Sequence, residues 1–381
     1  MKFLPLLVAN LSRRKVRTIL TIGSFAVALF LFGLLVTIRA AFNSGVAAAG
    51  ADRLVVINKV SIIQPVPLSY REKILRVPGI KEITYANWFG GVYQDEKNFF
   101  PQFAIETEHW RSIYPEYLVT DKEWADFVAT RTAAIAGEVT AKRFGWKVGD
   151  RIPIRGVFVQ GIWEFDLVGI YKGKRPQDDT SQFWFRHDYL RERGPEWARG
   201  FAGWYVARME PAADATAVSK AVDQLFTNST WETRTQSEQL FMASWVKQMG
   251  NIEFLMASIG AVVFFTLLLV TGNSMAMSVR ERTSELAVLK AVGFSDVFVL
   301  GLVLMETLLI ACIGGGLGIV AAKVFTTLSG DPTGGMLPVF YLPALGILAG
   351  LGVTLVVGLL AGLLPALSAM RLQVVQAFRR V

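Results

Sequence analysis

Residues 18–38 read TILTIGSFAVALFLFGLLVTI and contain no Asp, Glu, Lys or Arg. About 20 apolar residues in a helix cross the hydrocarbon core of a bilayer, so this stretch is long enough to span a membrane. Three further runs of this kind follow at 254–279, 297–322 and 337–370, and only Glu306 interrupts them. The sequence therefore predicts a polytopic α-helical membrane protein with four transmembrane helices.

The first run has a second interpretation, as the hydrophobic part of a cleaved signal peptide. A basic cluster precedes it at 13–17, and 47–49 are three alanines that offer a cleavage site. However, the apolar region of a signal peptide is about 7–15 residues long, whereas this run is longer and the cleavage site lies well beyond its end. We therefore predict an uncleaved helix.

Residues 41–250 have the composition of a soluble domain, with nearly balanced charge. The order of apolar and turn residues predicts an extracytoplasmic α+β domain of two lobes, in which the first and last segments pack together. Strands are expected at 54–57, 82–93, 151–159, 163–171 and 204–209, and helices at 68–76, 136–144 and 212–226. Either a ligand surface or a core could contain Trp88, Trp110, Trp163, Trp184 and Trp204, and cores are the commoner place for large aromatic side chains.

The chain has 39 Lys and Arg against 31 Asp and Glu, a formal net charge of +8. Basic residues cluster before the first apolar run, between the second and third, and after the fourth. The positive-inside rule makes these three segments cytoplasmic, so 41–250 and 325–342 are expected outside. The excess charge therefore records membrane orientation and contact with acidic lipid headgroups, and it implies no nucleic-acid binding.

The chain contains few Cys and His residues, which disulfides, Cys/His metal sites and catalytic triads require. The chain has one cysteine, Cys312, and two histidines, His109 and His187, so no internal disulfide and no Cys/His metal cluster are expected. No phosphate-binding loop motif occurs, and two distant histidines give no catalytic triad signal. We expect no catalytic residue, no metal site and no cofactor bound by this chain.

Residues 280–295 read RERTSELAVLKAVGFS. Opposite charges lie three or four residues apart beside an apolar stripe, which predicts an amphipathic helix, and Gly293 ends it. Two interpretations remain open from the residues alone: a solvated helix on the membrane surface, or a docking helix for a cytoplasmic partner.

This segment resembles the permease subunits of ABC transporters in the MacB/FtsX/LolC group. The pattern R-x-R-x-x-E-[IL]-x-x-L-[KR]-A-x-G is matched by Arg280, Arg282, Glu285, Leu286, Leu289, Lys290, Ala291 and Gly293. Patterns in the later helices are matched by Glu306, Gly314, Gly315, Gly318, Gly362 and Pro365. Residues 135–138, 147–150 and 165–170 are similar to the periplasmic core domain of the family, so the resemblance covers nearly the whole chain.

The resemblance implies a permease subunit of a bacterial cytoplasmic (inner) membrane with both termini in the cytoplasm. Two permease chains, as a homodimer or as a heterodimer with a paralogue, would dock on two copies of an ABC ATPase that binds ATP and Mg. The eight residues matched between 280 and 293 would form the coupling helix that sits in the ATPase cleft. A periplasmic adaptor or lipoprotein and membrane lipids are further implied partners. MacB itself carries its ATPase at the N-terminus, so here the ATPase is expected to be another chain.

The expected boundaries follow from the apolar runs and the resemblance. They are an amphipathic elbow helix at 1–17, transmembrane helices at 18–40, 251–279, 296–324 and 343–366, the external domain at 41–250, the coupling helix at 280–295, a short external loop at 325–342 and a cytoplasmic tail at 367–381.

The resemblance implies export or extraction of a hydrophobic or periplasmic substrate by mechanotransmission, in which the first two helices move the external domain. These two helices flank that domain directly in the sequence, so a tilt of either would act on it as a lever. The alternative is an FtsX-like regulatory permease that activates an external partner such as a cell-wall hydrolase.

Glu306 is the lone acid within an apolar run. A carboxylate at that depth costs about 2.5–3.5 kcal/mol on insertion scales, so its side chain is expected to face protein or to be protonated. A structural hydrogen bond, within or between subunits, is favoured over a proton or substrate site. Glycines spaced four apart at 314/318, 346/350 and 358/362 are typical of closely packed membrane helices.

Overall fold

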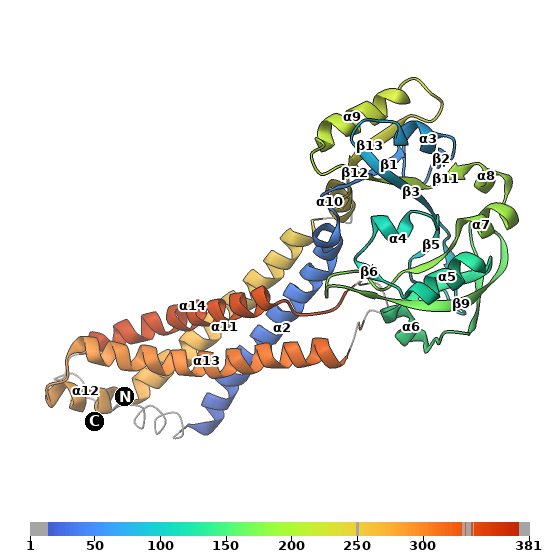
Figure 1. Ribbon diagram of the computed structural model, residues 1–381. Coiled ribbons are helices and arrows are strands. Elements are labelled where there is room, and N and C mark those ends of the chain that lie inside the picture. The colour runs from blue at the N-terminus through green and yellow to red at the C-terminus, as the bar shows by residue number, and fades with distance from the viewer. Residues whose placement is uncertain (1–13, 249–250, 330–331, 333–336, 338, 373–381) are drawn as a thin grey trace. The chain divides into compact units, whose positions relative to one another are not determined.

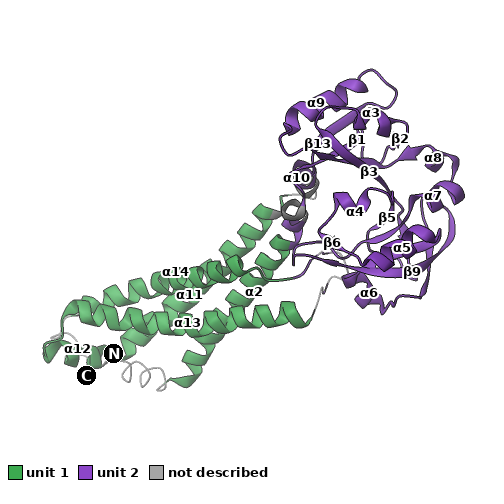
Figure 2. Ribbon diagram, viewed as in Figure 1, with its two compact units in different colours: residues 1–40, 251–330, 341–381 green, residues 41–250, 331–340 purple. Residues whose placement is uncertain are grey.

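The computed structural model describes residues 14–248, 251–329, 332, 337 and 339–372. The chain divides into two compact units: a helical unit of 1–40, 251–330 and 341–381, and an α+β unit of 41–250 and 331–340 (Figure 2). The expected elbow helix at 1–17 and tail at 367–381 lie mostly outside the described residues.

Four helices of the helical unit are long and apolar enough to cross a membrane (Figure 1). They are α2 (Lys15–Ala48), α11 (Ile252–Glu281), α13 (Asp296–Leu328) and α14 (Ala344–Met370), and the short α12 (Thr283–Ala291) joins α11 to α13. The structure confirms the predicted fold class, because an α+β domain lies between the first and second of these helices in the chain. The protein is a multi-pass membrane protein with four spans.

The helices are longer than the expected spans. At 1.5 Å per residue, the 34 residues of α2 extend about 50 Å, against about 30 Å of hydrocarbon. α14 runs through Pro365 to Met370 and does not stop at 366. Pro365 has no backbone N–H, so the carbonyl of Ala361 does not receive the usual helical hydrogen bond from residue 365. Gly272 of α11 lies against this carbonyl, where an added Cβ would be 3.6 Å from the oxygen.

Glycines of α13 allow a close approach to α2. A Cβ on Gly314 would lie 2.5 Å from the carbonyl oxygen of Ile22, and one on Gly318 would lie 2.3 Å from that of Ala26. Both distances are far inside van der Waals contact, so larger residues would force the helices apart. The four-residue spacing therefore marks a real seam between α13 and α2.

A second side of α13 packs along α14. A Cβ on Gly315 would lie 2.5 Å from the Thr354 side chain, and one on Gly362 would lie 2.7 Å from Oγ1 of Thr307. α13 is thus held between α2 and α14, and it is the most buried of the four helices within the chain.

The α+β unit is built on one continuous sheet with the strand order β13-β1-β12-β3-β5-β10-β7-β9-β8-β4, while β6 pairs with β9 and β11 pairs with β2. The strands are β1 (Arg53–Asn58), β2 (Val66–Pro67), β3 (Ile80–Trp88), β4 (Gly91–Val92), β5 (Gln102–Ile105), β6 (Tyr117–Leu118), β7 (Ala133–Gly137), β8 (Arg151–Gly156), β9 (Gly161–Gly173), β10 (Phe183–Arg186), β11 (Phe201–Ala202), β12 (Trp204–Met209) and β13 (Thr233–Ser237). The helices are α3 (Tyr70–Leu75), α4 (Trp110–Ile113), α5 (Asp121–Ala129), α6 (Glu138–Phe144), α7 (His187–Arg193), α8 (Glu196–Arg199), α9 (Ala215–Leu225) and α10 (Glu238–Gln248). The first and last segments are neighbours, because β1 pairs with both β12 and β13.

Three apolar clusters stabilise this unit. One joins β1, α3, β12 and α9, and the second surrounds Phe89, Trp163 and Phe183. The third contains Trp110 and Trp184 and lies on the opposite face of the sheet, because it uses the alternate residues of strands β5, β7, β9 and β10, which it shares with the second. Trp110, Trp163 and Trp184 therefore fill cores, whereas Trp88 is 39% exposed and stacks on Phe99.

Three secondary-structure predictions need correction. The strand expected at 151–159 ends at Gly156, because 157–160 form a turn before β9 begins. The helix expected at 136–144 begins only at Glu138, because 133–137 form β7, and the strand expected at 82–93 is broken after Trp88, where Gly90 has φ +64°. β7 is buried along its whole length, so it lacks the alternation of polar and apolar residues that reveals a half-exposed strand.

His187, the first residue of α7, is a buried histidine in this unit. Its side chain is 2% exposed, and its ring meets Tyr85 edge to face at 4.8 Å. Burial, opposed in part by Asp188, lowers the pKa of His187 to about 4. The imidazole is therefore neutral at pH 7.

We expect acid to destabilise the α+β unit through His187. The unfolded chain, with a pKa near 6.5, binds a proton between pH 6.5 and 4 that the folded chain does not bind. The free energy of unfolding is therefore unaffected by this histidine above pH 6.5, and His187 lowers it by about 3 kcal/mol as the pH drops to 4. Thermal melts across this range measure the loss. A His187→Phe variant, which keeps a ring against Tyr85, should lose this part of the pH dependence, and an unchanged profile would contradict the assignment.

Candidate functional site

The turn between α11 and α13 contains the residues that the sequence singles out, and we call residues 280–296 the α12 turn. Arg282 is the single residue between α11 and α12. Gly293 adopts φ +103°, which favours glycine, and Ser295 caps α13 by accepting a hydrogen bond from the Phe298 backbone N–H. The α12 turn is therefore short and conformationally defined at both ends.

One face of α12 packs into the helical unit. Leu286 is 2% exposed and Ala287 1%, and Leu289 is partly buried against the same apolar cluster, which includes Val299 and Ala366 of α13 and α14. The helix is thus fixed to its own chain by apolar contacts.

Arg282 and Glu306 form an ion pair. Nη1 of Arg282 donates to Oε2 of Glu306 at 2.8 Å, and Nε lies 3.6 Å from Oε2 of Glu285. The Glu306 side chain is 6% exposed and that of Arg282 18%. A cavity of about 10 Å³, on the scale of one water molecule, lies beside the pair. The lone acid of the apolar run is therefore the counter-ion of an arginine in the α12 turn.

Lys290 is also directed into the chain. Its Nζ donates to the carbonyl oxygens of Met370 at 2.5 Å and Leu372 at 3.0 Å, and it lies 2.7 Å from Oδ1 of Asp296. Only 8% of its side chain is exposed. A cation at the carboxyl end of a helix interacts favourably with the unpaired carbonyls, so Lys290 joins α12 to the end of α14.

A different set of side chains forms the outer face of the α12 turn. Glu285 has a side-chain exposure of 46%, and Val288 and Val292 are 48% and 73% exposed. Arg280, Ser284, Ala291 and Gly293 are exposed as well. The eight residues expected to couple to an ATPase thus divide between two faces, with Arg282, Leu286, Leu289 and Lys290 turned into the chain.

The structure adds contacts to α2 that the sequence interpretation missed. Arg17 donates to Oε2 of Glu281 at 2.9 Å and to Oγ of Ser278 at 3.0 Å, and the hydroxyls of Thr21 and Ser274 lie 3.2 Å apart. The signal was present, because these polar residues recur at intervals of three or four on each helix and so share one face. The sequence interpretation used Arg17 only as a mark of orientation.

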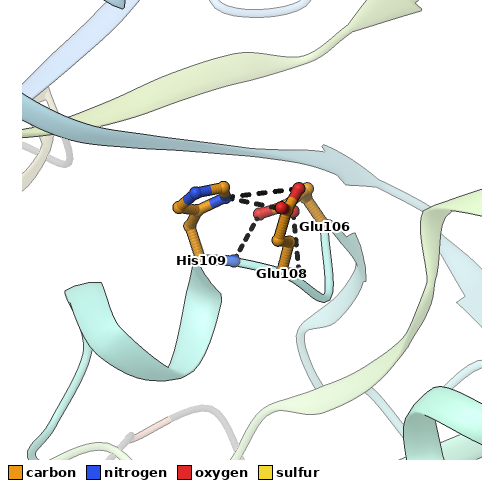
Figure 3. A group of neighbouring side chains, drawn as sticks. All are labelled: Glu106, Glu108 and His109. Carbon is orange, nitrogen blue, oxygen red and sulfur yellow. Dashed lines mark hydrogen bonds and ion pairs between the residues drawn. The ribbon is translucent and has the colours of Figure 1, made fainter.

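A second cluster of titratable side chains lies in the α+β unit. Ligand atoms of Glu106, Glu108 and His109 lie within 4.8 Å of one another in a loop before α4 (Figure 3). The prediction of no metal site rests only on the scarcity of Cys and His, so it does not weigh two carboxylates and a histidine this close together in the sequence.

The contacts of this cluster do not fit a metal ion. The Glu106 carboxylate already accepts hydrogen bonds from Thr84 Oγ1 and from the backbone N–H groups of Glu108 and His109. Nη2 of Arg71 lies 3.2 Å from Nδ1 of His109 and 3.9 Å from Oε2 of Glu108. A permanent cation therefore occupies the position where a metal would bind, and the cluster is a loop-ordering network.

Comparison with known families matches both parts of the chain. The MacB-like periplasmic core domain matches residues 18–225, and the FtsX-like permease C-terminal family matches residues 257–374. The second match contains α11 from residue 257, the α12 turn, α13 and α14.

Individual relatives agree with these matches. The uncharacterized ABC transporter permease MJ1507 of Methanocaldococcus jannaschii is 24% identical over 320 residues, which are 80% of this chain and 77% of the relative. The macrolide export ATP-binding/permease protein MacB of a Shewanella species is 37% identical over 108 residues, 28% of this chain and 16% of the relative. The uncharacterized ABC transporter permease YvrN of Bacillus subtilis is 34% identical over 111 residues, 28% of this chain and 25% of the relative.

Solved structures align with part of the chain. The periplasmic region of MacB from Actinobacillus actinomycetemcomitans covers 52% of this chain and 94% of its own, with 11% identity and a TM-score of 0.38. The extracellular domain of the ABC-type transporter YknZ from Gram-positive bacteria covers 49% of this chain and 100% of its own, with 12% identity and a TM-score of 0.36.

Proposed function

The chain belongs to the MacB/FtsX family of ABC transporter permeases, and we propose that a separate ATPase, which binds ATP and Mg²⁺, docks on the outer face of its α12 turn. Glu285 would supply charge complementarity at this interface, and Val288 and Val292 would supply apolar contact. The inward set, which consists of Arg282, Leu286, Leu289 and Lys290, would hold α12 in place.

The observation that supports this function best is that residues of the α12 turn are bonded to the other three membrane helices. Glu281 at the end of α11 pairs with Arg17 of α2, Arg282 pairs with Glu306 of α13, and Lys290 bonds the last carbonyls of α14. A displacement imposed on α12 would therefore be passed to all four helices at once. The direct test is hydrolysis: the reconstituted permease should stimulate its ATPase partner, and no stimulation would contradict the proposal.

We propose that α2 and α11 carry this displacement to the α+β unit. α2 is one uninterrupted helix from Lys15 to Ala48, and α11 begins four residues after α10 ends. Near one end these helices are joined by Arg17 and Glu281, and near the other by Arg39 and Glu253 at 3.1 Å. The second pair is exposed and contributes less than about 1 kcal/mol. Force would then reach the α+β unit without a substrate tunnel through the membrane.

We further propose a hydrophobic or amphipathic substrate that is exported or extracted from the outer side of the membrane. The MacB relatives are named as macrolide export proteins, and this substrate class is consistent with their chemistry. The MacB of the Shewanella species matches 28% of this chain and 16% of its own length, so the substrate class is proposed from a partial match.

A second permease chain would pack against α11. Only 11% of the apolar stretch of α11 is buried within this chain. Its exposed side chains include a row at intervals of three or four residues, namely Leu255, Ile259, Val262, Thr266, Leu269 and Asn273. An asparagine amide facing lipid would leave its hydrogen bonds unmade, whereas a partner helix can satisfy them. We therefore propose α11 as the face that meets a second copy.

The proposed orientation can be tested by cysteine labelling. In a Cys312→Ala background, Ile63→Cys lies at a position 87% exposed in the α+β unit, and Ser284→Cys lies on the outer face of the α12 turn. If the α+β unit is outside the membrane, a membrane-impermeant maleimide should label residue 63 in intact spheroplasts and residue 284 only after lysis. Labelling in the opposite order would reverse the topology.

A further inference from the structure

A buried arginine connects three segments of the α+β unit. Arg53, the first residue of β1, is 4% exposed. Its Nε donates to Oε2 of Glu238 at 2.5 Å, Nη2 pairs with Oε1 of Glu116 at 2.7 Å, and Nη1 donates to the carbonyl of Ile113 at 3.1 Å. The ring of Tyr114 lies 4.6 Å from the guanidinium carbon. We call these five residues the Arg53 junction.

The charge of the junction is unusual for a protein core. One cation faces two carboxylates, whose side chains are 6% and 12% exposed. Burial alone would lower the pKa of Arg53, but Glu238 and Glu116 outweigh burial and raise the pKa above its ordinary value, so the guanidinium stays charged. Buried ion pairs are often no more stabilising than apolar residues of the same size. Fixing the position of the connected segments is therefore a better reason for the junction than stability.

Two of the segments that meet at the junction connect the α+β unit to α2 and to α11 along the chain. The backbone N–H of Gly50, two residues after α2 ends, donates to Oε2 of Glu238 at 2.8 Å. Glu238 is itself the first residue of α10, which leads to α11. The ends of both connections are thus bonded to one carboxylate, and Arg53 bonds the same carboxylate.

The third segment, which contains Glu116, leads away from these connections. Glu116 precedes β6, and its carbonyl oxygen accepts a hydrogen bond from the Lys174 backbone N–H at 2.9 Å. β6 pairs with the end of β9, where Tyr117 lies opposite Gly173. The loop that follows β9 lines an open cleft of about 340 Å³ and is held by the fully buried carboxylate of Asp178, which accepts from the backbone and side chain of Arg175. Contacts are therefore continuous from the membrane connections to this cleft.

We propose that Arg53 is a positioning residue through which displacement of α2 and α11 is passed to the β6–β9 edge and its cleft. This inference rests on the proposed function and identifies the point at which the two membrane connections act together. Arg53 suits this role because a planar guanidinium holds two carboxylates and a carbonyl in fixed directions, which a lysine ammonium cannot do.

Spin-label distances test the proposal. Labels at Lys172→Cys on β9 and Lys220→Cys on α9, both exposed, are placed in a Cys312→Ala background. The permease is reconstituted in lipid nanodiscs with its ATPase partner, and the distance is measured without nucleotide and with ATP and vanadate. The variants are Arg53→Lys and Glu116→Gln. Glu232→Gln is the matched control, because Glu232 forms an exposed pair with Lys59 in the same unit.

We expect a nucleotide-dependent change of distance in the parent protein and in Glu232→Gln, and its loss in Arg53→Lys and Glu116→Gln while ATPase stimulation continues. Glu116 is the more exposed carboxylate, so Glu116→Gln carries the test if Arg53→Lys does not fold. A full distance change in Glu116→Gln would overturn the proposal, as would a parent protein that stimulates the ATPase with no change of distance. Absence of ATPase stimulation in the parent protein would instead contradict the proposed function.

Discussion

Replacing Glu306 by leucine is expected to destabilise the helical unit by about 3–5 kcal/mol. The change leaves the Arg282 guanidinium largely buried without its 2.8 Å partner, and an arginine cannot relieve the cost by losing its proton. Arg282→Met should be similarly harmful, because it leaves the carboxylate uncompensated. The double variant Arg282→Met/Glu306→Leu should lose much less free energy of unfolding than the two single variants together, because apolar residues of similar volume can replace a buried pair.

Unfolding of the purified protein in mixed detergent and SDS micelles measures these free energies by loss of helical circular dichroism. Glu253→Leu is the matched control, because Glu253 also pairs with an arginine at a helix end but is 66% exposed. This control should lose less than about 1 kcal/mol. If Glu306→Leu costs no more than Glu253→Leu, the pair does not fix the α12 turn to α13.

The four spans and the short helix between the second and third could be predicted because their signals are local. A run without charges is sufficient to indicate a membrane helix, and Gly293, which adopts the left-handed conformation, marks the end of the amphipathic segment. β12 was predicted at its observed bounds because it lies between turn residues. β7 could not be recognised, because both of its faces are covered and its alanine-rich sequence lacks the β-branched residues that made the equally buried β1 predictable.

The division of the α12 turn into two faces could not be predicted. α12 has nine residues, and both of its faces carry aliphatic side chains: Leu286 and Leu289 on one, Val288 and Val292 on the other. Periodicity alone therefore does not say which face packs against the chain. The deciding partners, Glu306 for Arg282 and the end of α14 for Lys290, are 24 and 80 residues away in the sequence. A pattern matched as one motif thus contains two physical roles.

The same two faces set the expectation for Glu285→Lys, which should reduce stimulation of the partner ATPase at least about tenfold, as a repulsive charge at an interface costs more than 1.4 kcal/mol. Folding should be little affected, because the Glu285 side chain is 46% exposed and exposed charges contribute little to stability. Hydrolysis is measured with purified ATPase titrated against permease in nanodiscs. Glu253→Lys makes the same reversal at the opposite end of α11 and should stimulate normally. Wild-type stimulation by Glu285→Lys would show that the ATPase docks elsewhere, whereas a lowered melting temperature would show that Glu285 belongs with the inward set.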